Sequence, residues 1–143
     1  MIHENPEVDI AVFSDNTIKN TGISIAEKYT YSQKTFILGF PNTWRIDAPN
    51  ISKKPIPFIK SGIISAISKS KSTNILLTDI VNNKGFSGGP LIIHDPNDLL
   101  WKVAGVVKGK VRNPNPDDKR FDEQGLTIAT EVNYIREIID SIE

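Results

Sequence analysis

Residues 84–91 read Lys84-Gly85-Phe86-Ser87-Gly88-Gly89-Pro90-Leu91, and they place one serine among three glycines and a proline, directly before an apolar run. Three glycines within five positions predict a tight turn or the close approach of another backbone segment. A serine on such a turn is exposed, and the amide N–H groups beside it are free to converge. An acyl-transfer nucleophile with its own oxyanion site needs this arrangement, although a glycine-rich turn that leads into a strand accounts for the same residues.

Length and composition predict one soluble globular domain. The chain has 143 residues, of which 38% are hydrophobic and 24% are charged, and a chain of this size buries a real core. Its 17 acidic and 17 basic residues balance to a formal net charge of zero. Since no global charge draws the chain to nucleic acid or to an anionic membrane, we expect neither as a partner.

The absence of cysteine excludes disulfides and cysteine-ligated metal sites. The only two histidines, His3 and His94, have no further ligand at a metal-binding spacing, so we expect no metal and no cofactor. No run approaches 18 apolar residues, and residues 1–6 lack the features of a signal peptide. These observations favour a cytoplasmic location for the chain as given.

Short apolar stretches punctuated by turn residues predict an all-β fold, either a barrel or a sandwich. Val8 to Phe13 reads as a buried strand with Asp9 embedded in it, and residues 14–34 read as a connection across the surface. Six strands are then expected, at residues 35–40, 58–67, 74–78, 90–94, 100–107 and 126–130.

The last residues have a helical pattern instead. Apolar side chains recur at helical spacing in the order Val132, Ile135, Ile138, Ile139 and Ile142. We expect this helix to pack its apolar stripe on the barrel. A surface for a partner is the alternative interpretation of the same stripe.

Taken in chain order, these segments resemble the trypsin-like (chymotrypsin-fold) serine peptidases, especially the cysteine-free bacterial ones. The resemblance lies in Asp9 on an apolar strand, the motif at 85–91, Val103-Ala104-Gly105-Val106-Val107, and Gly125-Leu126-Thr127-Ile128-Ala129 before a final helix. It implies that residues 1–34 are a remnant of an N-terminal barrel with the inter-barrel connection. Residues 35–131 would then form a six-stranded antiparallel Greek-key barrel, and residues 132–143 a C-terminal helix.

The resemblance also assigns catalytic roles. Ser87 would be the nucleophile, and the Gly85 and Ser87 N–H groups would form the oxyanion hole. Asp9 would orient a histidine base and stabilise its charged form, and a capping or turn acid at a strand edge is the alternative interpretation of Asp9. Phe86 stands where zymogen-type members carry an aspartate that pairs with a new N-terminal amine. Because phenylalanine cannot make this ion pair, we do not expect that activation switch here.

The substrate-binding residues implied by the resemblance are Val81, Lys108 and Gly109. Val81 would lie near the floor of the primary specificity pocket, while Lys108 and Gly109 would lie on the edge strand that binds substrate. An apolar floor predicts a small or apolar side chain before the scissile bond. A shifted loop that brought in Asp79 would reverse this preference toward lysine or arginine.

The general base is missing from the pattern. The family order is histidine, aspartate, serine, and only His3 precedes Asp9, at roughly 20 Å if the segment is extended. His94 follows Ser87 by seven residues, again roughly 20 Å along an extended chain. Both read more simply as surface residues, His3 near a mobile chain end.

The sequence therefore predicts a serine endopeptidase, acting on a protein or peptide substrate, that is present here without its histidine-bearing part. Such a chain would expose an open edge that the missing N-terminal barrel or a second copy could cover. The alternatives are a catalytically inactive binding module with the same fold, and an unrelated small β-barrel whose glycine-rich turn mimics the motif.

Overall fold

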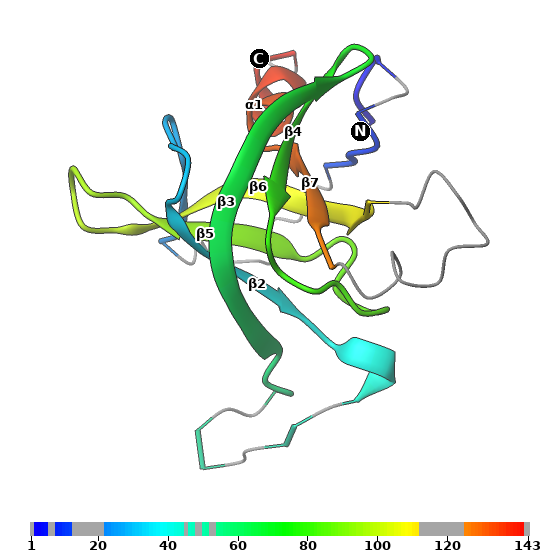
Figure 1. Ribbon diagram of the computed structural model, residues 1–143, viewed down its shortest axis with the longest axis vertical. Coiled ribbons are helices and arrows are strands. Elements are labelled where there is room, and N and C mark those ends of the chain that lie inside the picture. Colours follow the sequence, from blue (N-terminus) through cyan, green and yellow to red (C-terminus); the bar gives the residue numbers. More distant parts are fainter. Residues whose placement is uncertain are drawn as a thin grey trace.

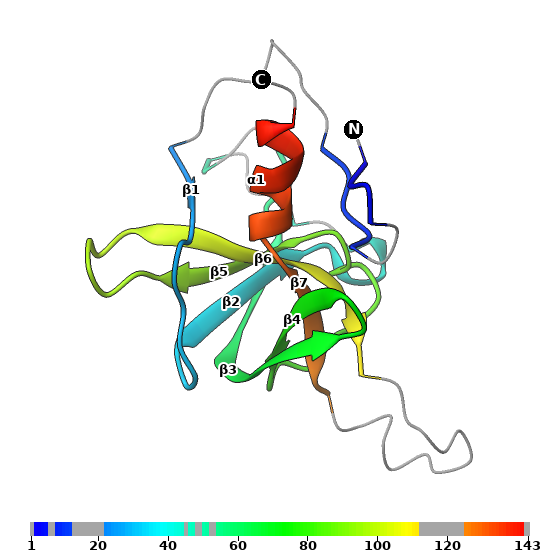
Figure 2. The same ribbon diagram turned by 90° about the horizontal axis from the view of Figure 1, so that it is seen from above.

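A computed structural model describes residues 2–5, 8–12, 22–44, 46–47, 50–51, 54–111 and 125–141. The barrel strands curve around one core, and an α-helix lies across one end of them, with the N-terminal segment beside it (Figures 1 and 2). The end of the first predicted strand at Phe13, the part of the predicted connection at 14–34 that precedes residue 22, and Ile142 lie outside the described residues.

All six strands predicted for the barrel are present, and each differs from its predicted bounds by at most a few residues. They are β2 (Lys34–Gly39), β3 (Phe58–Ser70), β4 (Thr73–Thr78), β5 (Pro90–His94), β6 (Trp101–Lys110) and β7 (Thr127–Glu131). A short strand, β1 (Ser24–Ile25), and a 3₁₀ turn, η1 (Pro41–Thr43), are additional. The sequence predicts residues 14–34 as a surface connection, so β1 is a feature that the sequence pattern did not indicate.

The six strands form a closed antiparallel barrel. Neighbours follow the order β6-β5-β2-β3-β4-β7, and β7 pairs back onto β6. Closure leaves no free edge among these six strands, because each has two neighbours. The short β1 adds to β6 in parallel.

The barrel interior is filled by alternating residues of the strands. In β2, every second residue is buried, so Thr35, Ile37 and Gly39 face inward. The interior cluster contains large side chains with almost no exposed surface from the strands and from the loop before β5, namely Ile37, Ile64, Leu76, Leu91, Ile93, Val107 and Phe86.

The predicted C-terminal helix is α1 (Asn133–Asp140). It buries Tyr134 and Ile138 against Val8 and Ile10 of the N-terminal segment, so its apolar stripe packs within the molecule. Ile139, which was predicted to belong to the stripe, is 40% exposed. Within the described ranges, no helix has the length and apolar character needed to cross a membrane.

The N-terminal segment differs from its predicted strand. Val8 and Ile10 are buried as expected, but residues 8–12 form only one bridge, between Ala11 and Ile2. Asp9 is exposed and has a φ of 52°. Aspartate tolerates this left-handed conformation better than most residues, and the turn that it makes interrupts extended pairing.

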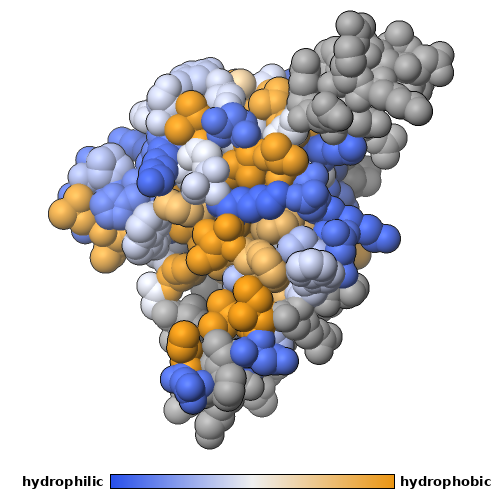
Figure 3. Space-filling model, turned by 60° about the horizontal axis from the view of Figure 1, so that its bottom comes forward, coloured by the Kyte–Doolittle hydropathy of each residue, from blue (hydrophilic) through white to orange (hydrophobic). Residues whose placement is uncertain are grey.

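Several large apolar side chains remain on the surface. Figure 3 shows one face on which hydrophobic residues form a broken band crossed by hydrophilic ones. A shallow groove of about 470 Å³ has an entirely apolar lining, contributed mainly by β2, β3, β5 and β6, and formed by Ile23, Phe36, Leu38, Ile59, Ile92 and Trp101. Exposed patches of this kind mark surfaces where other molecules bind or where proteins aggregate.

The turn between β5 and β6 is built on a buried carboxylate, that of Asp95. Its Oδ2 accepts a hydrogen bond from Lys102 Nζ at 2.8 Å, and its Oδ1 accepts from the Asn97 backbone and side chain, each at 2.9 Å. The lysine and these N–H donors lower the pKa of Asp95 to about 2. The turn between β5 and β6 therefore depends on the negative charge of Asp95.

Asp95 should make the protein sensitive to acid. Its folded pKa lies below the value of about 3.9 for an unfolded chain, so its stabilisation is complete above pH ~5 and disappears as the pH falls toward 2. Asp95→Asn should lower the urea midpoint at pH 7. The difference in urea midpoint between this variant and the unsubstituted protein should shrink continuously as the pH is lowered from about 5 to about 2.5. A difference that stays constant over this range would contradict the assigned role.

Candidate functional site

The loop that carries Ser87 joins β4 to β5 and is held from two sides. Two backbone bonds tie it to the end of β2 and to η1, and two more tie it to β6. They run from Phe40 N–H to Gly85 O (3.0 Å), Asn42 N–H to Lys84 O (2.9 Å), Gly88 N–H to Val107 O (2.7 Å) and Val107 N–H to Gly89 O (2.8 Å). We call residues 83–89 the serine loop.

Two glycines of the serine loop are needed because another backbone touches them. A Cβ on Gly85 would lie 2.1 Å from Phe40 O, and a Cβ on Gly89 would lie 2.0 Å from Leu38 O. Gly85 also has a φ of +104°, which side chains other than glycine rarely adopt. The glycine cluster thus marks a close approach of the serine loop to β2, as its sequence predicted.

Phe86 anchors the serine loop in the core. Its side chain has no exposed surface, and it is the largest of the fully buried side chains. The ring packs in the interior cluster of the barrel, and a Cβ on Gly39 of β2 would lie 2.8 Å from it. An apolar ring therefore fills the position at which the resemblance places an aspartate in zymogen-type members.

Ser87 is exposed on top of this anchored loop. Among the described residues, no protein acceptor takes the amide N–H of Gly85 or of Ser87, although both flanking amides, those of Phe86 and Gly88, are bonded. Unpaired amides at an exposed position are free to donate to a ligand. Gly85 and Ser87 are the two donors that the sequence predicted for an oxyanion hole.

A pocket of about 430 Å³ opens beside Ser87. It is lined by Ser87 and by residues of the segment before it and of β6, namely Asn82, Asn83, Lys84, Gly109 and Lys110. The structure thus brings together Ser87 and Gly109, which the sequence placed at the nucleophile and at the substrate-binding strand. Asn82, Asn83 and Lys84 were not singled out from the sequence.

One wall of this pocket is held by Lys60, which the sequence pattern also did not single out. Lys60 lies on β3, and its Nζ donates to Val81 O at 2.8 Å and to the Asn83 side-chain oxygen. The same ammonium lies 5.2 Å from the centre of the Phe86 ring, within the range of a cation–π contact. Burial lowers the pKa of Lys60.

The position of Lys60 in β3 is the sequence feature from which its role could have been predicted. Phe58, Lys60, Gly62 and Ile64 alternate along β3, and Ile64 is buried in the core. A lysine on the inward side of an alternating strand needs an acceptor, so this register could have identified it.

Two of the predicted substrate-binding residues do not line the pocket. Val81 is half-exposed and lies against Gly125, where a Cβ would come within 2.5 Å of the Val81 Cα. Lys108 is exposed on β6, next to Gly109. Asp79, the predicted alternative for the pocket floor, instead accepts a hydrogen bond from Ile63 N–H at 2.7 Å.

Asp9 belongs to a different cluster of contacts from Ser87. Its neighbours Val8 and Ile10 pack on α1 and near Val106 of β6. Within the described part of the chain, the Asp9 carboxylate makes no hydrogen bond or ion pair, and none joins it to a histidine. A role in orienting a base therefore stays a prediction from the resemblance.

His3 is bound on both ring nitrogens, contrary to its predicted place on an open surface. Nδ1 accepts from Asn5 N–H at 3.0 Å, so the proton of the neutral ring lies on Nε2, which contacts Glu137 of α1 at 2.8 Å. Its side chain is only 12% exposed, and the ring meets Tyr134 edge-on. Because its basic nitrogen is already occupied, His3 is not placed to accept a proton from Ser87.

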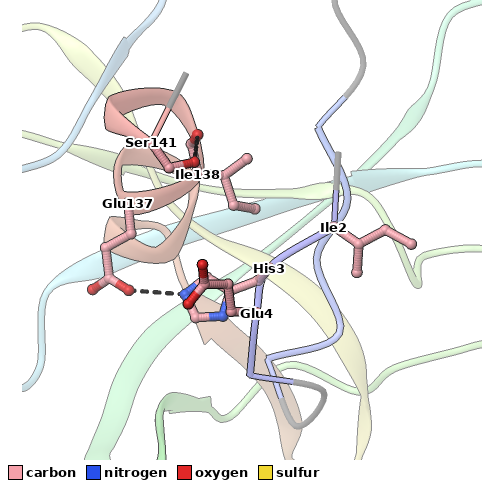
Figure 4. A pocket seen from close by; sticks show the side chains of 6 residues that line it. All are labelled: Ile2, His3, Glu4, Glu137, Ile138 and Ser141. Atoms are coloured by element: carbon pink, nitrogen blue, oxygen red, sulfur yellow. Dashed lines mark hydrogen bonds and ion pairs between the residues drawn. The ribbon is translucent and has the colours of Figure 1, made fainter. Parts of the chain in front are cut away.

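A small pocket of about 220 Å³ surrounds this histidine, and Figure 4 shows its six lining side chains. It contains a histidine, a glutamate and a serine, but they do not form a relay. Ser141 Oγ donates to Ile138 O at 2.6 Å, within its own helix turn, while His3 is engaged with Glu137. The pocket is a contact between the N-terminal segment and α1.

His94 lies at the far end of β5. Pro90 begins β5 next to the serine loop. His94 is four residues further along the strand, which places it about 13 Å from Pro90. The ring meets Trp101 edge-on at 4.9 Å. Neither histidine of the chain is therefore placed to act on Ser87, and within the described ranges no hydrogen bond reaches the Ser87 hydroxyl.

In the segments that the structure describes, no group of three or more histidine or acidic residues is arranged to hold a metal ion. The described residues supply this site with a serine hydroxyl, two amide donors and the side chains of Lys84 and Lys110.

Sequence comparisons give no family for this chain. No protein-family model matches it, and no curated protein does. Among solved structures, the chain is similar to the HtrA-type protease AlgW, in a variant solved with a decapeptide, with a TM-score of 0.57 over 84% of this chain. The fold is that of a trypsin-like barrel.

The likeness covers only part of that protease. Identity is 16%, and this chain spans 32% of the length of the other, about one third. The shared feature is therefore the fold. The predicted class, an all-β six-stranded antiparallel barrel with a C-terminal helix, is confirmed.

Proposed function

We propose that this barrel carries the nucleophile half of a serine endopeptidase site, with Ser87 as the nucleophile. The observation that carries the proposal is the pair of unpaired amides at Gly85 and Ser87, which flank an exposed hydroxyl at the rim of a pocket. Tying the serine loop to two strands preorganises these donors, and preorganised donors stabilise a developing oxyanion effectively.

In the proposed reaction, Ser87 Oγ attacks the carbonyl carbon of the scissile peptide bond. The hydroxyl proton passes to a general base and then to the leaving amine as the C–N bond breaks. The Gly85 and Ser87 amides hold the carbonyl oxygen while it carries negative charge. Water afterwards releases the acyl group from Ser87 by the reverse sequence of proton transfers.

The general base in this proposal comes from outside the described residues. His3 Nδ1 already accepts a hydrogen bond from Asn5 N–H, and His94 lies at the end of β5 that is farther from Ser87. Without a base, serine attack loses several orders of magnitude in rate. The proposal therefore includes a base-bearing segment or partner chain that docks beside Ser87.

Reaction with a fluorophosphonate tests this function. The natural gene product that contains this sequence should be labelled at Ser87, and Ser87→Ala should abolish the labelling because the reagent has lost its acceptor oxygen. Mass spectrometry of the labelled peptide identifies the site. Labelling that persists unchanged in Ser87→Ala would contradict the proposal.

A binding module without catalysis is the second candidate, and the engaged state of His3 favours it. In that case the natural gene product would not react with the fluorophosphonate at Ser87. It would still bind peptides at the pocket beside Ser87, which separates this outcome from a protein that has no site there.

A further inference from the structure

The backbone pairing between β3 and β4 stops before the chain reaches the serine loop. The last ladder pair joins Thr78 to Ile64. One further bond follows, from Asp79 N–H to Ile63 O at 3.3 Å. Among the described residues, no backbone hydrogen bond ties residues 80–82 to β3. The segment that leads into the serine loop is therefore held to β3 by side chains.

Lys60 of β3 supplies two of these side-chain bonds. Its Nζ donates to Val81 O at 2.8 Å and to the side-chain oxygen of Asn83. Hydrogen bonds from an ammonium group are stronger than those between neutral partners. A backbone carbonyl and a side chain two residues apart are thus attached to one strand, at the point where the serine loop begins.

The same ammonium also contacts the far side of Gly85. It lies 5.2 Å from the centre of the Phe86 ring, and Phe86 N–H donates to Asn83 O at 3.4 Å, which closes a turn over residues 83–86. Gly85 lies inside this turn, with a φ of +104°. Lys60 therefore contacts both ends of the turn that contains one of the two oxyanion donors.

The direction of the Gly85 N–H group depends on the peptide plane that it shares with Lys84 O. That oxygen accepts a hydrogen bond from Asn42 N–H of η1 at 2.9 Å. Because the C=O and N–H of a trans peptide point in opposite directions, the Gly85 N–H points away from η1. A single bond to the oxygen leaves the plane free to rotate about that bond, and the contacts of Lys60 at both ends of the turn oppose this rotation.

We propose that Lys60 is a positioning residue for the oxyanion hole, which it orients by holding the turn at 83–86 from the side opposite η1. This role rests on the proposed function, because it takes the amides of Gly85 and Ser87 as the donors to the substrate carbonyl. Lys60 itself does not line the pocket beside Ser87. It acts through the serine loop, and donors that are fixed before the reaction stabilise an oxyanion most effectively.

Hydrogen exchange, resolved to single amides by NMR, tests the positioning without requiring catalysis. Lys60→Met removes the ammonium and keeps an unbranched side chain. In the natural gene product that contains this sequence, Phe86 N–H should then exchange about tenfold faster, the size expected for the loss of one hydrogen bond. Gly88 N–H, which donates to Val107 O on the β6 side at 2.7 Å, should keep its rate. An unchanged rate at Phe86 overturns the proposal.

The rate of fluorophosphonate labelling tests the effect on the proposed reaction. In Lys60→Met the maximal rate at Ser87 should fall about ten- to a hundredfold, since misplacing a reacting group by about 1 Å can cost about 10²-fold. The reagent concentration that gives half the maximal rate should not change, because the pocket lining is intact. Lys60→Arg keeps the charge and the donors, so it should recover most of the rate.

Lys69→Met is the matched control, because Lys69 is an exposed lysine near the other end of β3. It should be labelled at the rate of the unsubstituted protein. A loss of rate that Lys60→Arg does not recover, or one that Lys69→Met reproduces, would mean that the specific contacts of Lys60 do not orient the serine loop.

The failure of this inference is distinguishable from failure of the proposed function. If Ser87 is labelled equally fast in Lys60→Met and in the unsubstituted protein, the positioning role is wrong and the endopeptidase proposal stands. If Ser87 is not labelled in the unsubstituted protein while exchange at Phe86 responds to Lys60→Met, Lys60 does orient the serine loop and the catalytic proposal fails.

Discussion

Gly85→Ala should destabilise the protein by about 2–6 kcal/mol and should also disrupt the serine loop. Two costs add at this position. A side chain at a φ of +104° is strained by about 1–3 kcal/mol. The new Cβ would also lie 2.1 Å from Phe40 O, a backbone atom, and overpacking of this kind costs about 1–3 kcal/mol more. Urea denaturation, followed by tryptophan fluorescence and by circular dichroism, measures the loss.

Two neighbouring glycines separate these costs. Gly88 has a φ of +84°, and an added Cβ would meet nothing within 4 Å, so Gly88→Ala should show the strain alone. Gly109 has open space and no positive φ, so Gly109→Ala should change stability by no more than about 0.5 kcal/mol. Equal losses for Gly85→Ala and Gly88→Ala would mean that the contact with Phe40 contributes nothing.

The strands of the barrel were predictable from the sequence because each strand is specified by residues that are adjacent in the chain. Each strand has a short apolar run between turn residues, and β5 and β4 were predicted within one residue of their observed bounds. The glycines of the serine loop were equally readable, since Gly85 and Gly89 do lie against the backbone of β2 and the residue that follows it. The strand pattern alone left a barrel and a sandwich open, and the closed six-stranded barrel, which the pairing of β7 with β6 confirms, was expected from the family resemblance.

The features that were missed depend on contacts between distant segments. Lys60 meets Val81 and Asn83 across more than twenty positions of sequence, so its register in β3 indicates that it needs an acceptor but does not indicate which residues supply it. The bonds that occupy His3 depend on where α1 packs. The lining of the pocket beside Ser87 likewise depends on how the segment at 82–84 lies against Gly109 and Lys110 of β6.

Phe86→Ala is expected to cost about 3–5 kcal/mol, because the ring is fully buried and its removal leaves a cavity that a closed barrel cannot easily collapse. Phe40→Ala is the matched control. Phe40 is 39% exposed at the end of β2, so its truncation should cost clearly less. Urea denaturation measures both, and equal losses would contradict the anchoring role of Phe86.

The same ring should couple the core to the pocket, which a purely structural side chain would not do. Lys60 lies over the Phe86 ring and also holds Val81 and Asn83, so losing the ring frees the ammonium that supports the pocket wall. Phe86→Ala and Lys60→Met should therefore be non-additive in a double-mutant cycle on the free energy of unfolding, measured by urea denaturation. Strict additivity would mean that the ring and the ammonium act independently, and the pocket wall would then owe its position to the backbone bonds of the serine loop alone.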